Sequence, residues 1–567
     1  MPTALQPQYD FAIIGAGLTG MNQMYQLRSI GATVRVFEAG EDVGGTWHWN
    51  RYPGCTLDSE SFTYGYAFAK DMLQDWNWSK RYASQPEVLS YFREFADRYD
   101  IRKDVEFNTR ILSARYDERH NLWELEKDNG EVATARFVIT AVGLLSEPLD
   151  PPIPGKGDFK GEAYNTSSWP RDPDGLGGLP GISFAGKRVA VIGTGSTGIQ
   201  VIQEVAKTAD ELVVLQRDAS WAFPLGNESL DAEKMAEIRS RYEEIFATCD
   251  MSPGGFYCLP QMTSALDVTP EERRTQFEAL YEESGFGLWL GNYHDVLAPG
   301  EANRLLGEFV AEKIRQRVND PAVADVLIPK DHVFGSRRVP LETNYYEVYN
   351  QDNVRLVDLM KTPIMRINDE GVELSSGQVD LDMIVYATGF KAVRGAIDRI
   401  EIVGRNGEKL SAKWQDRPVT YLGVQSSGFP NFFMQLGPYH GATFCNIPRC
   451  VEHSVTWLTE LFRRAREQDV DYIEATPEAE IKWTDQVAEE AAQSLFMTTD
   501  SFITGSNAAG AARTFLFYAS GNPTYRQIIS EIAADNYAGF AMLKAEAPDA
   551  RPSPSGGLMG AVQTPDH

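Results

Sequence analysis

One pattern, three glycines spaced GxGxxG between an apolar run and a helix-like stretch, occurs twice in this chain and constrains its fold most strongly. The glycines are Gly15, Gly17 and Gly20 in the first copy and Gly193, Gly195 and Gly198 in the second. Such glycines let the backbone approach a pyrophosphate, and the following helix N-terminus adds partial positive charge. A lone match is weak, because a glycine-rich turn can simply pack a helix on a sheet. Two matches in full context predict an α/β fold with two Rossmann-like dinucleotide-binding domains.

The residue at the end of the next strand distinguishes the two sites. In the first copy the run TVRVFE ends in Glu38, whose carboxylate can accept hydrogen bonds from a free ribose 2′-hydroxyl. We therefore assign the first site to FAD. The matching position in the second copy is Arg217, which suits a 2′-phosphate, and we assign that site to NADPH. Asp218 follows directly and would repel a phosphate unless its side chain turns away, so the preference for NADPH over NADH stays open.

The sequence beyond the two GxGxxG segments predicts that the FAD domain is split into two parts of the chain. We call each GxGxxG segment a phosphate cradle. The apolar run LDMIVYATGF (381–390) is similar to FVITAVG, which follows the first cradle, and we interpret it as the strand that returns the chain to the FAD domain. Residues 228–330 have helical patterning, with a helix start at Thr269 to Glu272, and predict a helical insertion. The predicted parts are the first FAD-domain part (1–145), a linker with the first NADPH-domain part (146–227), the helical insertion (228–330), the second NADPH-domain part (331–380), the second FAD-domain part (381–545) and a disordered tail (546–567).

Composition excludes several other classes of protein. A chain of 567 residues favours two or three domains, and a net charge of −27 argues against nucleic-acid binding. No apolar run is long enough to span a bilayer, and the opening MPTALQPQYD does not resemble a signal peptide. The five cysteines form no CxxC pair, and the seven histidines form no HExxH. We therefore expect a soluble cytoplasmic protein without a metal site, of undetermined oligomeric state.

The connector between the two cradles has the sequence FKGEAYNTSSWP (159–170), and several of its residues match a motif of a known family. It resembles the fingerprint F-x-G-x-x-x-H-x-x-x-W, followed by Pro or Asp, of the type I Baeyer–Villiger monooxygenases. The matching residues are Phe159, Gly161, Trp169 and Pro170. Asn165 stands in the place of the histidine; it offers a donor and an acceptor but cannot take up a proton. The resemblance implies that this crossing couples two domains that must shift, a role Asn165 can fill if it is structural.

Two further segments are similar to signatures of the same family. GGTWHWNRYPGCTLD (44–58) resembles a signature that ends in an active-site aspartate, here Asp58. FGSRRVPLETNYYEVYNQDNV (334–354) resembles the segment that carries the active-site arginine, which places that role on Arg338 and a 2′-phosphate contact on Arg337. The similarity extends from about Tyr9 to Leu543 and is especially close to phenylacetone monooxygenase-like members.

The resemblance implies a reaction as well as a fold. NADPH would reduce FAD, the reduced flavin would form a C4a-peroxide with O2, and this peroxide would convert a small-molecule ketone to an ester or lactone. Arg338 would stabilise the developing negative charge, and Asp58 would orient and compensate Arg338. Two alternatives stay open: an enzyme of the same fold that oxidises nitrogen or sulfur, and an uncoupled NADPH oxidase or flavin-binding regulatory protein that would release hydrogen peroxide.

Other site residues are expected from their position in these segments. Trp47 is expected at the edge of the flavin and nicotinamide, although core packing would also explain it. The segment LGPYHGATFCNIPR (436–449) should begin a helix near Ile447 and Pro448. By resemblance, Phe444, Ile447 and Phe502 are candidates for the substrate pocket, with core packing as the alternative. Further cofactor contacts are expected at Thr46, Asp58, Tyr64, Thr194, Ser196, Thr197, Gln200 and Ile447.

Overall fold

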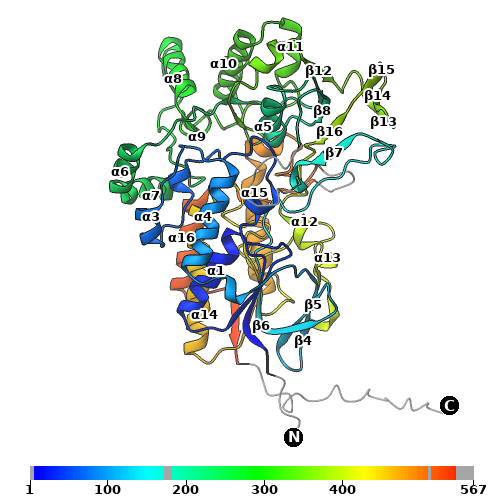
Figure 1. Ribbon diagram of the computed structural model, residues 1–567. Helices are drawn as coiled ribbons and strands as arrows, with labels where there is room; N and C mark the ends of the chain where they lie inside the picture. Colours follow the sequence, from blue (N-terminus) through cyan, green and yellow to red (C-terminus); the bar gives the residue numbers. More distant parts are fainter. Residues whose placement is uncertain (1–5, 171–181, 508–512, 545–567) are drawn as a thin grey trace, which may run out of the picture.

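The computed structural model describes residues 6–170, 182–507 and 513–544; the tail expected to be disordered lies outside them. One sheet lies in the lower half of the molecule in Figure 1, with strand order β17-β4-β5-β6-β1-β2-β3 and β18 also paired to β6. Its strands are β1 (Tyr9–Ile14), β2 (Val34–Phe37), β3 (Val105–Glu106), β4 (Ile111–Asp117), β5 (Leu122–Lys127), β6 (Val132–Thr140), β17 (Glu401–Val403) and β18 (Phe432–Met434).

A second sheet lies in the upper half, with strand order β12-β9-β8-β16-β7 and parallel pairing throughout. Its strands are β7 (Glu162–Asn165), β8 (Arg188–Ile192), β9 (Glu211–Gln216), β12 (Val354–Asp358) and β16 (Met383–Tyr386). The apolar residues of the three central strands, β8, β9 and β16, are buried on both faces, as a parallel sheet covered by helices requires. Two Rossmann-like units were predicted, and the two sheets confirm them.

The prediction that the strand within 381–390 returns the chain to the FAD domain is wrong. Ile384 of β16 pairs with Ala190 of β8 and Ala163 of β7, so this strand belongs to the second sheet. The likeness of its sequence to FVITAVG has a physical cause: β6 lies beside β1 as β16 lies beside β8, and each strand is followed by an alanine whose carbonyl faces the first glycine of its cradle. The chain rejoins the first sheet only at β17, so the boundary expected at residue 381 moves beyond Tyr386.

Helices α1 (Leu18–Ser29) and α14 (Ile447–Glu467) pack together on the first sheet, in blue and orange in Figure 1. Phe462 of α14 anchors them, because its ring lies 4.8 Å from Phe11 of β1, 5.4 Å from Phe137 of β6 and 5.0 Å from Phe433 of β18. Aromatic contacts of this kind contribute beyond their buried area. The N-terminus of α14 at Ile447, with a proline in its first turn, agrees with the prediction.

The expected helical insertion contains α6 (Ala232–Ser240), α7 (Tyr242–Met251), α8 (Pro270–Glu282), α9 (Gly287–Leu290), α10 (Glu301–Arg317) and α11 (Pro321–Leu327). The predicted start of α8 is a capping box: Thr269 accepts from the Glu272 backbone, and the Glu272 side chain accepts from the Thr269 backbone. Helix α7 contacts α14 and α16 (Asn522–Ala534), so the insertion also packs against the lower half of the molecule.

The remaining α-helices and strands lie outside the two sheets and the insertion described above. The helices are α2 (Thr46–Trp49), α3 (Lys70–Asp75), α4 (Gln85–Arg98), α5 (Ser196–Val205), α12 (Arg394–Ile397), α13 (Leu410–Lys413) and α15 (Pro477–Ala492). The strands are β10 (Phe223–Pro224), β11 (Leu341–Glu342), β13 (Ile364–Ile367), β14 (Gly371–Leu374), β15 (Gly377–Asp380), β19 (Tyr472–Ala475) and β20 (Phe540–Leu543). Among the residues described, no helix has the length and apolar character that crossing a bilayer would require.

Candidate active site

The first cradle connects β1 to α1 and is built by close backbone contacts. Gly15 has a φ of +106°, and a side chain there would also lie 2.6 Å from the carbonyl oxygen of Ala141. A side chain on Gly20 would overlap the carbonyl oxygen of Gly15. Gly45 faces Gly17 so closely that a Cβ on Gly45 would lie 2.8 Å from the Cα of Gly17. The loop before α2 therefore covers the cradle.

Glu38 lies at the end of β2, as predicted, and is 5% exposed. One carboxylate oxygen accepts from the backbone N–H of Ala16 at 2.7 Å, and the other accepts from Gly40 at 2.7 Å. Burial raises the pKa of Glu38, and these two hydrogen bonds act against that shift. Each oxygen can still accept a further bond, so the cradle and its carboxylate fit the pyrophosphate and ribose of FAD.

The second cradle connects β8 to α5 and repeats this geometry. Gly193 has a φ of +107°, and a side chain on Gly198 would overlap its carbonyl oxygen. A Cβ on Gly195, in contrast, would meet no atom within 4 Å. Ser196 and Thr197 form the first turn of α5, directly beyond this open space. The space at the helix N-terminus fits the pyrophosphate of a dinucleotide.

Replacing Gly195 by valine is expected to block the second cofactor while preserving the fold. Gly195 has an extended conformation (φ −76°, ψ −172°) that any residue can adopt, and its surroundings are open. The affinity for NADP⁺ should therefore fall on the order of a hundredfold, while FAD content stays unchanged. Gly157, whose Cβ would also meet nothing within 4 Å, provides the matched control Gly157→Val. Calorimetric titration with NADP⁺ measures both; equal affinity in the two variants would contradict the assignment.

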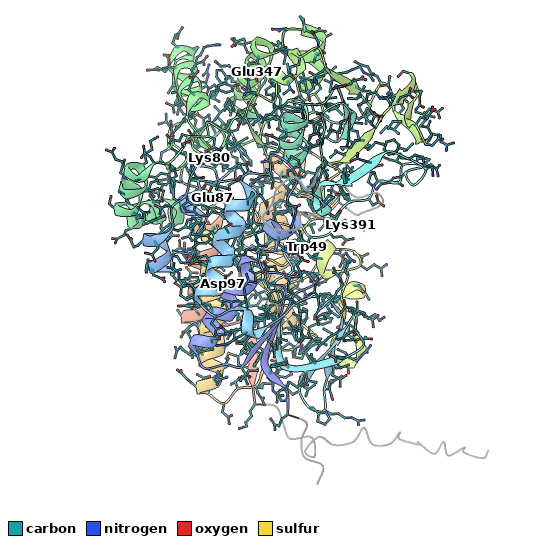
Figure 2. The ribbon with its side chains drawn as sticks, viewed as in Figure 1. Trp49, Lys80, Glu87, Asp97, Glu347 and Lys391 are labelled. Carbon is teal, nitrogen blue, oxygen red and sulfur yellow. The ribbon has the colours of Figure 1, made fainter. Side chains whose placement is uncertain are left out.

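The segment 44–58 joins the two cradles. Tyr52 donates from its hydroxyl to Oε1 of Gln200 on α5 at 2.8 Å, and Nε2 of Gln200 donates to the carbonyl of Thr56 at 3.1 Å. A Cβ on Gly54 would lie 2.6 Å from the Gln200 carbonyl oxygen. Figure 2 labels Trp49, the last residue of α2, in the middle of the molecule where the two halves meet. We expected Gln200 to contact a cofactor; in this structure its side chain links α5 to the segment 44–58 through these two hydrogen bonds.

Asp58 and Arg338, 280 residues apart, form an ion pair at this junction. Nη2 of Arg338 donates to Oδ2 of Asp58, and the two side chains are 25% and 26% exposed. The guanidinium also lies over the ring of Phe286, 5.4 Å from its centroid. The Asp58 carboxylate and the Phe286 ring together fix the position of the positive charge.

Trp47 and Tyr64 pack near this ion pair. The indole N–H of Trp47 donates to the Tyr64 hydroxyl at 3.3 Å, and the rings meet edge to face with centroids 5.6 Å apart. Burial raises the pKa of Tyr64, on which Asp58 and Arg338 act in opposite directions. Tyr64 is therefore a neutral hydrogen-bonding group at neutral pH. Thr46, the first residue of α2, is exposed beside them.

The crossing 159–170 is more than a connector, because it adds the edge strand β7 to the second sheet. Gly161 is closely packed, since a Cβ there would lie 2.6 Å from the carbonyl oxygen of Asp382. Phe159 packs against the core of the second sheet. Trp169 is 2% exposed and lies 5.2 Å from the ring of Tyr164. The fingerprint residues thus attach the crossing to the second sheet.

Asn165 ends β7 and caps the short 3₁₀ helix Thr166–Ser168. Its side-chain oxygen accepts from the backbone N–H of Ser167 at 3.0 Å and from the Ser167 hydroxyl at 2.7 Å. Asn165→Ala should therefore lower the free energy of unfolding by about 1 kcal/mol, the usual effect of losing a cap. Asn165→Asp keeps an acceptor oxygen and should retain most of the stability. Denaturant unfolding compares the two; equal losses would exclude the capping role.

The candidate pocket residues separate into two groups. The rings of Phe444 and Phe502 both contact Phe517, at 6.1 Å and 5.9 Å. Phe444 also lies 5.7 Å from Trp289, which in turn lies 5.4 Å from the Phe286 ring beside Arg338. Phe444 is therefore connected to Arg338 by a continuous row of rings.

Ile447 is not part of this row. It begins α14 and packs against a separate cluster that includes Leu436 and Val451. The sequence did not indicate Phe286 and Trp289 as site residues. Phe286 precedes the first turn of α9 in the helical insertion, and Trp289 lies within that helix. The apolar run FGLWL (286–290), within a largely polar helical segment, was the signal that could have identified them.

The groups expected to hold the 2′-phosphate lie at the end of β9 and in the segment before Arg338. Arg217 has a 72% exposed side chain, and its Nε lies 2.9 Å from Oδ2 of Asp218. Arg337 donates from Nη2 to Oδ2 of Asp331 at 2.8 Å. Thr194 of the cradle donates from its hydroxyl to the carbonyl of Asp218 at 2.9 Å. Asp218 therefore does not turn away from Arg217.

Comparisons with known proteins agree with this architecture. A family model described as flavin-binding monooxygenase-like matches residues 8–241. The chain is 45% identical over 540 residues to 2-oxo-Δ3-4,5,5-trimethylcyclopentenylacetyl-CoA monooxygenase of Pseudomonas putida, covering 95% of this chain and 99% of that protein. It is 40% identical over 536 residues to the methyl acetate-forming acetone monooxygenase of Gordonia sp. (strain TY-5), covering 94% and 99%.

Two further similarities complete the picture. Phenazine N-monooxygenase PhzNO1 of Lysobacter antibioticus is 40% identical over 543 residues, covering 94% of this chain and 96% of that protein. A crystal structure of OTEMO in complex with FAD and NADP superposes with a TM-score of 0.92 at 45% identity, covering 95% of this chain and 100% of that one.

Proposed function

This chain belongs to the Baeyer–Villiger monooxygenases, which depend on FAD and NADPH, and we propose that it inserts one oxygen atom of O2 next to the carbonyl of a ketone, giving an ester or lactone. The observation that carries the proposal is the Arg338–Asp58 ion pair at the junction of two dinucleotide cradles. In this proposal, the pair supplies one fixed cation at the point where both cofactors and the substrate meet.

The residues at the junction have separable roles. Bound FAD, reduced by NADPH, supplies the activated oxygen. The guanidinium of Arg338 stabilises negative charge as it develops on the oxygen of the ketone carbonyl, since its donors are oriented before the reaction begins. Asp58 holds Arg338 in that orientation and compensates its charge, because an unpaired guanidinium in a half-buried site is costly.

The surroundings of Arg338 favour an apolar substrate. The row of rings from Phe286 through Trp289 to Phe444 gives one side of the site an aromatic character. Such a wall excludes water, which strengthens the electrostatic effect of the guanidinium. We therefore propose a ketone with a sizeable hydrocarbon body, and O2 as cosubstrate.

A second candidate is oxygenation of an aromatic nitrogen. A phenazine N-monooxygenase is 40% identical over nearly the same length, and the aromatic row would suit a planar substrate. The two reactions make different demands, because attack on a nitrogen creates no carbonyl oxyanion for Arg338 to stabilise. We also propose a cytoplasmic location, which suits the five free cysteines.

Product analysis tests the proposal. The purified yellow protein would be supplied with NADPH, O2 and a panel of linear, aryl and cyclic ketones, with phenazines and sulfides in parallel. Ester or lactone accounting for most of the NADPH consumed is the expected result. N-oxide or sulfoxide without ester would favour the second candidate, and hydrogen peroxide alone across the panel would indicate an uncoupled oxidase.

A further inference from the structure

Both arginines expected at the 2′-phosphate are already paired with carboxylates. Arg217 is paired with Asp218 through its Nε at 2.9 Å, and Arg337 with Asp331 through Nη2 at 2.8 Å. Asp218 also faces the second arginine, since its Oδ2 lies 3.9 Å from Nη1 of Arg337. A single carboxylate therefore lies between the two guanidinium groups.

The position of Asp218 is set by the cradle itself. Its backbone carbonyl accepts from the hydroxyl of Thr194, which lies between the first two glycines of the second cradle. Its side chain is 27% exposed, and that of Arg337 is 24% exposed. Thr194 thus fixes the backbone of Asp218, and the carboxylate can leave the phosphate-binding edge only by losing its contacts with both arginines.

The charges at this edge cancel. Two guanidinium groups and the carboxylates of Asp218 and Asp331 sum to zero, whereas a phosphate monoester carries about −1.5 to −2 at neutral pH. A 2′-phosphate must therefore take arginine donors away from carboxylates that remain nearby and repel it. A ribose with a free 2′-hydroxyl does not meet that opposition.

We propose that Asp218 is a specificity-determining residue that competes with the 2′-phosphate for Arg217 and Arg337, and so brings the affinities for NADPH and NADH closer together. The inference rests on the NADPH site of the proposed function and specifies its selectivity. It predicts that removing one negative charge at position 218 selectively strengthens binding of the phosphorylated cofactor.

The test is the variant Asp218→Asn, which keeps the shape of the side chain and the Thr194 hydrogen bond to the backbone. NADP⁺ and NAD⁺ are titrated calorimetrically into the FAD-loaded protein, so the readout does not depend on turnover. NADP⁺ should bind about tenfold more tightly, with NAD⁺ unchanged. The matched control is Glu211→Gln, which removes the same charge at the opposite end of β9, where Glu211 lies 3.5 Å from Arg355; it should change neither affinity.

A third variant, Arg217→Ala, separates failure of the inference from failure of the site assignment. If it weakens NADP⁺ selectively but Asp218→Asn leaves NADP⁺ binding unchanged or weaker, the site is correctly assigned and Asp218 holds Arg217 in place instead of competing with the phosphate. If Arg217→Ala leaves NADP⁺ binding unchanged, the phosphate lies elsewhere, and both the assignment and the inference are overturned.

Discussion

Replacing Arg338 with alanine is expected to lower the rate of ester formation by about a hundredfold to a thousandfold, the usual effect of removing a preorganised donor to a developing oxyanion. Anaerobic reduction of bound FAD by NADPH should change far less, because the two cradles proposed to hold the cofactors do not include Arg338. Stopped-flow loss of flavin absorbance measures reduction, and ester per NADPH measures oxygenation. The variant should consume NADPH and release hydrogen peroxide.

Two companion variants establish why Arg338 matters. Arg338→Lys keeps a positive charge but loses the planar fork that reaches Asp58, so it should recover only part of the oxygenation. Asp58→Asn removes the compensating charge and should impair oxygenation while Arg338 is intact. If Arg338→Ala formed ester at the normal rate, or lost flavin reduction and oxygenation equally, the role assigned to Arg338 would be wrong.

Replacing Glu342 with alanine is expected to lower the free energy of unfolding by about 3–5 kcal/mol, because it removes the buried one of the two carboxylates that pair with the largely buried guanidinium of Arg317. The Glu342 side chain is 0% exposed and accepts two hydrogen bonds from Arg317, at 2.6 Å and 3.1 Å. A third bond comes from the backbone of Tyr345 at 2.7 Å. Glu342 lies in β11, four residues beyond Arg338, so this ion pair also attaches the arginine segment to α10 of the insertion.

The same arginine supplies the control. Glu347, labelled in the upper part of Figure 2, also pairs with Arg317 at 2.6 Å, but its side chain is 40% exposed. Glu347→Ala should therefore lower the free energy of unfolding by less than about 1 kcal/mol, as the loss of an exposed ion pair usually does. Unfolding of the two FAD-loaded variants in guanidinium chloride measures both losses. Equal losses would show that burial does not govern this network.

The parts of the fold that depend on local backbone geometry could be predicted from sequence. GxGxxG between a strand and a helix, Glu38 at the end of β2 and the capping box at Thr269 each act within a short segment, and the structure contains all of them. The strand at Met383–Tyr386 could not be assigned in this way. Both halves use the same strand pattern beside their cradle, and only hydrogen-bond pairing with β8 distinguishes them.

Some of the long-range contacts at the candidate site could be predicted from the sequence. Signature segments brought Asp58 and Arg338 together although local patterns could not, and the ion pair between them is present. Phe286 and Trp289 belong to no signature, and their relation to Arg338 depends on how the insertion folds back. The partner of Arg337 was equally hidden, since nothing in the run from Asp331 to Arg337 indicates that their side chains meet.

The most direct test of the central claim is a turnover in ¹⁸O₂. The FAD-loaded protein, NADPH and a cyclic ketone would react under the labelled gas, with product analysed by mass spectrometry and hydrogen peroxide measured against NADPH consumed. We predict a lactone that carries one ¹⁸O atom, in amounts close to the NADPH oxidised. Unlabelled product, or labelled hydrogen peroxide with no lactone from any ketone, would contradict the assignment of oxygen insertion to this chain.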